Sequence, residues 1–241
     1  MALGGGSFTV QNKTLPGAYI NFISKSAATA ALSDRGICTM PLELDWGEEG
    51  AVFEVTNEAF KKRSLQLFGY DYTDEKLKGL RDLFMGAKTL YAYRLNGDGK
   101  KASNTFAEAK YSGTRGNDLK IVIQQNADQS ALYDVQTYLG SAKVDTQTVK
   151  AAADLVANDF VTFKSGASLA TTAASPLTGG TNGTVDGTAH QTYLDLVEPF
   201  AFNTMGVVVS DATTLKLYNS FVKRMRDEMG VKFQLVTYKN A

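Results

Sequence analysis

Two apolar runs, Met205-Gly206-Val207-Val208-Val209 and Phe233-Gln234-Leu235-Val236-Thr237, decide the fold class of this chain. The first run is apolar almost without interruption, which is typical of a strand buried in a parallel sheet. Ser210 or Asp211 then supplies a helix N-cap, and apolar side chains recur at helical spacing up to Met229. The order of strand, helix and strand predicts a β-α-β unit of an α/β fold. We expect the second strand to be central in its sheet.

The first half of the chain predicts the same kind of layer. A helix is expected over 57–68, because Thr56 and Asn57 are N-cap candidates and Gly69 is a typical terminator. A second helix is expected over 73–86, with Asp and Glu in its first turn. The Thr- and aromatic-rich segment 89–95 predicts a strand. Helices that alternate with strands in this way indicate layers of helices on a sheet.

The middle of the chain has a different pattern. Strands are expected at 119–123 and 160–163, and Gly140-Ser141 joins two alternating runs into a predicted hairpin. Residues 165–187 are rich in Gly, Ser, Thr and Ala and predict a long loop or a poorly packed strand. These patterns indicate a β-rich module inserted into the α/β part.

The N-terminal residues have the pattern of a strand without an evident partner. Polar and apolar residues alternate over 7–11, and they alternate again over 18–23 beyond a Pro-Gly turn. No tight hairpin follows, so this strand either covers its own domain's sheet or is lent to a neighbouring molecule. The chain is thus expected to have five parts. They are an extended N-terminal arm (1–24), a first part of the α/β core (25–95), an inserted β-rich domain (96–164), a Gly/Ser/Thr-rich loop (165–187) and a second part of the α/β core (188–241). The first part of the core is expected to start with a mixed connection (25–52).

Composition excludes several classes of protein. With 44% hydrophobic and 21% charged residues the chain has an ordinary globular composition, not that of a disordered protein. Lys+Arg and Asp+Glu are 25 each, so there is no excess of basic residues of the kind that nucleic acid attracts. The single cysteine excludes an internal disulfide. No apolar run is long enough for a membrane helix, and the first residues lack the pattern of a signal peptide.

Candidate catalytic residues are few. His190 is the only histidine, and its polar surroundings predict a solvated residue near the start of a helix. Cys38, between Ile37 and Thr39, is more typical of a small buried residue than of a nucleophile. No His, Cys and carboxylate cluster has metal-ligand spacing. We therefore predict no catalytic residue, no cofactor, no metal and no enzymatic activity.

Two segments that contain several glycines are candidate ligand loops. Residues 179–186 resemble one copy of a calcium-binding repeat, but such sites need tandem copies, and the Lys of a phosphate loop is missing. Residues 113–117 precede a strand, whereas a dinucleotide-binding loop follows one. In residues 179–186 we expect glycine to provide backbone freedom in a long loop.

Seven stretches, taken in order, resemble one family. They are 15–22 (LPGAYINF), 41–47 (PLELDWG), 68–72 (FGYDY), 88–94 (KTLYAYR), 111–117 (YSGTRGN), 177–183 (LTGGTNG) and 223–228 (KRMRDE). The chain resembles the tail sheath proteins of contractile phage tails, in the short form found in prophages and R-type bacteriocins of Firmicutes. The similarity covers essentially the whole chain; each motif is weak, and the specificity lies in their order and spacing.

The resemblance implies a structural subunit that polymerises in helical rings around an inner tube and contracts to drive that tube through a target cell envelope. It implies an α/β core with a subtilisin-like fold and no protease site, carrying an inserted β-rich domain. The implied partners are other copies of the subunit, the inner tail tube protein, and the baseplate and tail terminator proteins, without nucleic acid or membrane insertion. The implied location is the bacterial cytoplasm during assembly and afterwards the virion or bacteriocin tail.

The resemblance also assigns a role to the arm. In the family, terminal arms add strands to a sheet in the C-terminal domain of a neighbouring subunit, which is β-augmentation. The residues predicted to act in subunit assembly are Phe8, Val10, Leu15, Pro16, Ala18, Ile20 and Phe22. Family members usually continue well past the equivalent of Tyr238 into that C-terminal domain, so we expect it to be absent from a chain that ends at Ala241.

Two alternatives belong to other functional classes. The β-rich residues 96–164 could form a glycan- or receptor-binding module. The less favoured alternative is an α/β hydrolase that uses His190 with Asp195 or Asp186.

Overall fold

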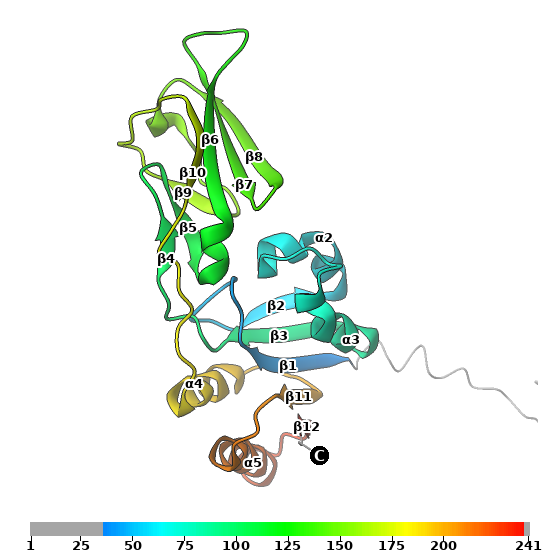
Figure 1. Cartoon of the computed structure of the whole chain (residues 1–241). Helices are drawn as coiled ribbons and strands as arrows, with labels where there is room; N and C mark the ends of the chain where they lie inside the picture. The colour runs from blue at the N-terminus through cyan, green and yellow to red at the C-terminus, as the bar shows by residue number, and fades with distance from the viewer. Residues whose placement is uncertain (1–35, 239–241) are drawn as a thin grey trace, which may run out of the picture. The chain divides into compact units, whose positions relative to one another are not determined.

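The computed structural model describes residues 36–238, and its α/β part is built on a five-stranded sheet of strand order β12-β11-β1-β3-β2 (Figure 1). The strands are β1 (Ile37–Leu42), β2 (Phe53–Thr56), β3 (Thr89–Arg94), β11 (Thr204–Val207) and β12 (Gln234–Thr237). β2 runs antiparallel to β3, and the other neighbours are parallel. The predicted α/β class is therefore confirmed.

Helices lie on both sides of this sheet. They are α2 (Asn57–Phe68), α3 (Lys78–Gly86), α4 (Gly187–Val197) and α5 (Ala212–Asp227), with a short 3-10 turn, Glu75–Leu77, before α3. One apolar core, around Phe60, Phe84 and Leu90, packs α2 and α3 on β2 and β3. A second, around Tyr193, Met205 and Tyr218, packs α4 and α5 on the opposite face (Figure 1). Period-two alternation in the strands sends successive side chains into these two cores.

Local signals position α2 and α5 close to the predicted places, whereas the helix expected over 73–86 is a 3-10 turn followed by α3 from Lys78. Thr56 accepts a hydrogen bond from the Ala59 backbone N–H at the start of α2, and Gly69 ends that helix with φ +76°. Asp211 caps α5 by accepting from the Thr214 N–H at 2.8 Å. Caps of this kind satisfy backbone groups that a helix end leaves without partners.

The β-rich part consists of two antiparallel sheets. One has the order β10-β6-β7-β8 and the other β4-β5-β9. Their apolar faces enclose a third core, which includes Ile121, Ile123, Val161 and Leu177. The strands are β4 (Lys101–Ser103), β5 (Ala107–Ser112), β6 (Leu119–Gln125), β7 (Tyr133–Leu139), β8 (Ala142–Val149), β9 (Val161–Phe163) and β10 (Thr172–Pro176), with 3-10 turns at Thr114–Asp118 and Ala152–Asp154.

Three expectations need correction. Residues 25–52 are not merely a connection, because β1 lies inside them and pairs with both β3 and β11. For residues 165–187, expected to be a long loop or a poorly packed strand and assigned as a loop, the strand alternative holds in part, because β10 pairs antiparallel with β6. Within residues 36–238, β12 is an edge strand that pairs with β11 alone, so the prediction of a central strand is wrong for this part of the chain.

Candidate functional site

An ionised carboxylate links the α/β sheet to the β-rich part. Asp45, in the loop after β1, accepts hydrogen bonds from Tyr70 Oη at 2.8 Å, Lys76 Nζ at 3.0 Å and Asn182 Nδ2 at 2.9 Å. Burial by itself raises the pKa of Asp45, but these hydrogen bonds outweigh it and lower the pKa to about 2. Asp45 therefore holds three separate segments of the chain around one negative charge.

A buried guanidinium makes a second link. Arg94, at the end of β3, is 1% exposed, and its Nη1 donates to the carbonyls of Ser112 at 2.9 Å and Gly47 at 3.2 Å. Its Nε donates to Asn96 Oδ1 at 3.3 Å, and Glu49 lies 4.0 Å away. Burial lowers the pKa of Arg94, while Glu49 opposes that change. Because Ser112 ends β5, this side chain cross-links the two parts of the fold.

The segment 113–117 packs against the α/β part. Arg115 Nε donates to the Gly69 carbonyl at 2.7 Å, and its guanidinium lies 4.5 Å from the centre of the Tyr70 ring. Gly113 has φ +124°, and a Cβ there would overlap the Asp45 carbonyl oxygen. The glycine thus permits a close approach of two backbones.

The glycine-rich segment 179–186 crosses the same region. Gly180 donates its N–H to Asn117 Oδ1 and accepts from Asn117 Nδ2, both at 2.8 Å. The Gly183 N–H donates to the Asn96 carbonyl at 3.0 Å. These backbone groups are therefore hydrogen-bonded to other segments of the same chain. Within residues 36–238, no group of three or more His, Cys, Asp or Glu is placed to bind a metal.

We call the region around Asp45, Arg94 and Arg115, where the α/β part meets the β-rich part, the junction. The only tryptophan also lies in this junction. Trp46 follows Asp45, is 1% exposed and donates its Nε1–H to the Gln66 carbonyl at 3.1 Å. Its ring packs edge-on against Tyr111 at 5.3 Å and stacks on Phe160 at 6.2 Å, inside the core of the β-rich part. The loop after β1 thus places a large apolar anchor in the other half of the fold.

Five of the seven motifs that carry the family resemblance contribute residues to this junction. They are 41–47, 68–72, 88–94, 111–117 and 177–183. The motifs are recognisable in the sequence, but no local pattern predicts that they meet in space. Four of them (41–47, 68–72, 88–94 and 111–117) contain charged and aromatic residues, which are the available signal.

His190 does not form the catalytic pairs that the hydrolase alternative requires. It is 5% exposed, not solvated as expected, and its Nδ1 lies 2.7 Å from Tyr218 Oη. Asp186 instead caps α4 by accepting from the Ala189 N–H, and Asp195 accepts from Gln191 Nε2. Burial lowers the pKa of His190. This arrangement is that of a neutral core histidine.

Cys38 is also a core residue. Its Sγ donates to the Thr89 carbonyl at 3.5 Å, and burial raises the pKa of the thiol to about 11. None of the helices between residues 36 and 238 is both long and apolar enough to span a membrane. The predicted assembly residues Phe8, Val10, Leu15, Pro16, Ala18, Ile20 and Phe22 lie outside the described residues.

Family models match the two parts that this junction joins. The model of the phage tail sheath protein beta-sandwich domain matches residues 95–182, and the model of the tail sheath protein Gp18 domain III N-terminal region matches residues 35–95. The chain belongs to the phage tail sheath family. The prediction from the sequence motifs is thus confirmed.

Solved sheath structures share the fold. The sheath tail protein of Desulfitobacterium hafniense superposes with a TM-score of 0.79 at 36% identity, covering 93% of this chain and 56% of that one. The sheath tail protein Lin1278 of Listeria innocua gives a TM-score of 0.74 at 32% identity, covering 87% of this chain and 50% of that one.

Curated relatives come from Bacillus subtilis. The phage-like element PBSX protein XkdK is 33% identical over 261 aligned positions, covering 98% of this chain and 55% of XkdK. Protein YqbK is also 33% identical, covering 98% of this chain and 56% of YqbK. This tail sheath chain therefore spans about half the length of the relatives it matches.

Proposed function

We propose that this protein is a structural subunit of a contractile tail sheath that polymerises around an inner tube and contracts to drive the tube through a target cell envelope. The observation that carries the proposal is the match of two sheath domain models in succession over residues 35–182. Its partners are then further copies of itself, the inner tube protein, and the baseplate and tail terminator proteins. It assembles in the bacterial cytoplasm and ends in the tail of a virion or bacteriocin.

The junction supports this mechanical role. Lattice contraction needs rigid bodies that change neighbours without changing their own fold. The Asp45 and Arg94 links join the two parts of the chain through charged hydrogen bonds, which are stronger and more directional than neutral ones. The α/β sheet and the β-rich part therefore move as one body during contraction.

The core is proposed to be a subtilisin-like sheath core without a protease site. A mainly parallel sheet with helices on both of its sides supports this assignment. The match of residues 95–182 to a domain of the sheath itself favours this function over a separate glycan-binding module. The contacts of His190 with Tyr218, and of Asp186 and Asp195 with other groups, favour a structural protein over a hydrolase.

The division of the chain into an arm (1–24), two core segments (25–95 and 188–241) and an insertion is likewise a proposal. Because β10 pairs with β6, we extend the insertion from 96–164 into the segment 165–187. The arm would add a strand to a neighbouring subunit through Phe8, Val10, Leu15, Pro16, Ala18, Ile20 and Phe22. Main-chain hydrogen bonds would join the subunits, and the tether would let them reorient.

Electron microscopy of the protein, produced together with its inner tube protein, tests the assembly. We expect rings or tubes, and we expect deletion of residues 1–24 to abolish them while leaving the unfolding of residues 36–238 unchanged. A protein that stays monomeric at high concentration would overturn the proposal. Tubes that form equally well without the arm would overturn its assigned role.

A further inference from the structure

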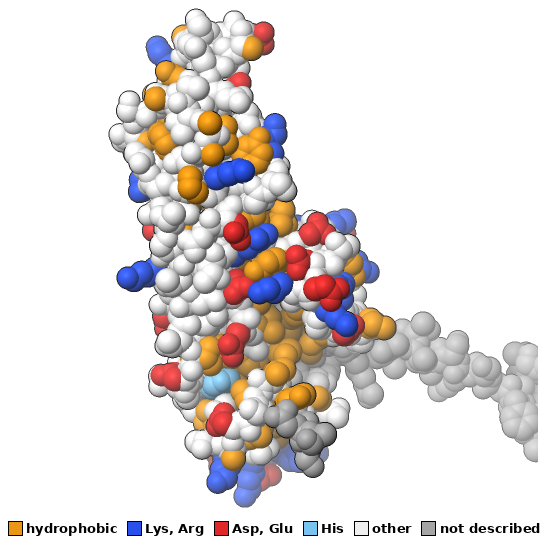
Figure 2. Space-filling model, in the orientation of Figure 1, with side chains coloured by type: hydrophobic (Ala, Val, Ile, Leu, Met, Phe, Trp, Pro, Cys, Tyr) orange, Lys and Arg blue, Asp and Glu red, His pale blue; other side chains and the backbone are white. Residues whose placement is uncertain are grey.

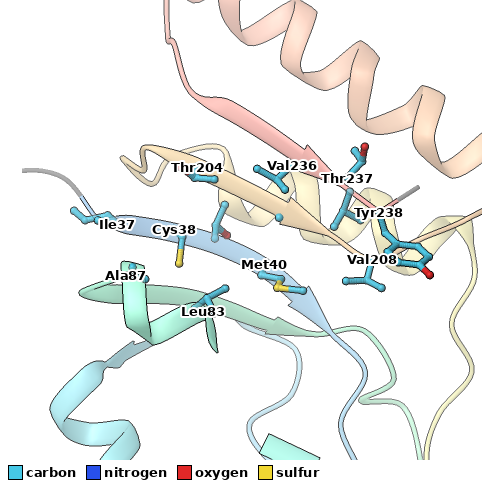
Figure 3. Close-up of a pocket in the computed structure, with 15 residues that line it drawn as sticks. Ile37, Cys38, Met40, Leu83, Ala87, Thr204, Val208, Val236, Thr237 and Tyr238 are labelled. Carbon is cyan, nitrogen blue, oxygen red and sulfur yellow. The ribbon is translucent and has the colours of Figure 1, made fainter. Parts of the chain in front are cut away.

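One face of the five-stranded sheet carries an uncharged groove. It lies on the α3 side of β1, β11 and β12, has a volume of about 490 Å³, and none of its fifteen lining residues is charged (Figure 3). Leu83 of α3 and Ala87, which follows the end of α3, form one side, and Val236 and Tyr238 form the other. Met40 lies between them on β1. The surface therefore suits an apolar occupant.

Apolar side chains on this face are unusually exposed. Val208 is 64% exposed, Val236 50% and Tyr238 53%. In Figure 2, hydrophobic side chains gather on this side of the sheet, below α2 and α3. Parallel strands normally have both faces covered. The opposite face follows that rule, since Met205 and Val207 are buried under α4 and α5.

The groove is wide enough to hold one α-helix. Three strands at a spacing of roughly 4.8 Å present about 10 Å of surface beside α3, and a helix with its side chains is about 10 Å wide. Gly206 lies on the floor, where the nearest atom to an added Cβ would be Met40 Sδ at 3.5 Å. Because glycine has no side chain, the backbone of an incoming helix can come closer to the sheet at this position. Among the described residues, the far side ends at the unpaired edge of β12.

We propose that this groove seats an amphipathic α-helix carried by the sheath polypeptide outside the region that this chain matches in its relatives. About half of each relative lies outside that region, which is ample length for such a helix. Its buried face is apolar and uncharged, and it packs beside α3 as a third helix on the side of the sheet that carries α2 and α3. The inference rests on family membership and not on contraction.

Alkylation of an engineered cysteine tests the proposal. The chain has one cysteine, so Cys38→Ser with Val236→Cys places a single reporter on the groove. Cys38→Ser with Val156→Cys is the matched control, because Val156 is 69% exposed but lies in the β-rich part. The probes are overlapping synthetic peptides of about 20 residues, roughly 30 Å long as helices, that span the whole of XkdK.

We expect a peptide from outside the matched region of XkdK to slow alkylation at position 236 roughly tenfold when present at ten times its dissociation constant. The same peptide should leave position 156 unchanged. Adding Val208→Asp should abolish the protection, because it places a charge in the groove, whereas Lys110→Gln in the β-rich part should not. Circular dichroism of each variant checks that it is folded.

Three outcomes would overturn the proposal. No peptide protects position 236, or only peptides from the matched region do so. Alternatively, alkylation at position 236 slows as protein concentration rises without peptide, which would identify the groove as an interface between copies of this chain. None of these results bears on whether rings or tubes form, so failure here is distinguishable from failure of the proposed function.

Discussion

Replacing Asp45 by asparagine removes the charge at the centre of the junction with little change of shape. The lowering of its pKa from 3.8 to about 2 corresponds to about 2–3 kcal/mol, at about 1.4 kcal/mol per unit. The side chain is 24% exposed, so solvent screening reduces this to about 2 kcal/mol. The substituted side chain would also present an amide donor to Tyr70, Lys76 or Asn182, which are themselves donors. We therefore expect Asp45→Asn to lower the free energy of unfolding by about 2 kcal/mol at pH 7.

The effect of Asp45→Asn on the free energy of unfolding should depend on pH. A carboxylate whose pKa is lowered by folding stabilises the protein above pH 3.8, and this contribution is lost as the pH falls toward 2. The difference between wild type and Asp45→Asn should therefore shrink by about half at pH 3. Urea unfolding followed by the fluorescence of Trp46, the only tryptophan, measures it at both pH values. Equal stabilities at pH 7, or a difference that does not shrink at pH 3, would refute the role assigned to Asp45.

Three further predictions test the packing. Gly113→Ala should destabilise the protein by more than about 1 kcal/mol in urea unfolding, because φ is +124° and the Cβ meets the Asp45 carbonyl; a neutral result contradicts the close approach. Phe60→Ala removes a fully buried ring 4.9 Å from that of Phe84 and should cost about 3–5 kcal/mol in a thermal scan, whereas a change below about 1 kcal/mol would exclude a packed core there. His190→Gln should lose less stability than wild type as the pH falls below 6.5, because burial lowers the pKa of His190 and protonation then favours unfolding; parallel pH profiles would show that His190 is not buried as a neutral group.

Local patterns predicted much of the fold. The helices α2 and α5 have capping residues, apolar faces and terminating glycines that act within a few residues of one another, so their positions follow from the sequence. The hairpin of β7 and β8 was likewise predicted from the turn at Gly140 and Ser141.

β1 was missed for a physical reason. Pro41 lacks a backbone N–H and argues against a central strand. In the structure the paired register between β1 and β11 covers Cys38 and Thr39 only, so Pro41 lies beyond the ladder on that side. The pairing that makes β1 central depends on β3 and β11, which are distant in sequence and leave no local signal.

The junction could not be predicted for a similar reason. Asp45 and Asn182 are 137 residues apart, and only the topology brings them together. The burial of His190 depends in the same way on Tyr218, a residue of another helix. Sequence indicated which residue types were present, but not which of them share a partner.

The hydrogen bond between Gly183 and Asn96 has a consequence for the evolution of the fold. It joins the point at which the chain leaves the α/β layer to the point at which the chain returns. The β-rich part therefore begins and ends at the same place on that layer. Each doubling of the length of such an insertion adds only about 0.6 kcal/mol to the entropic cost of bringing its two ends together. Lineages can therefore enlarge, shrink or exchange this module and leave the layer that bears it intact, provided that the residues around Asp45 and Arg94 are kept.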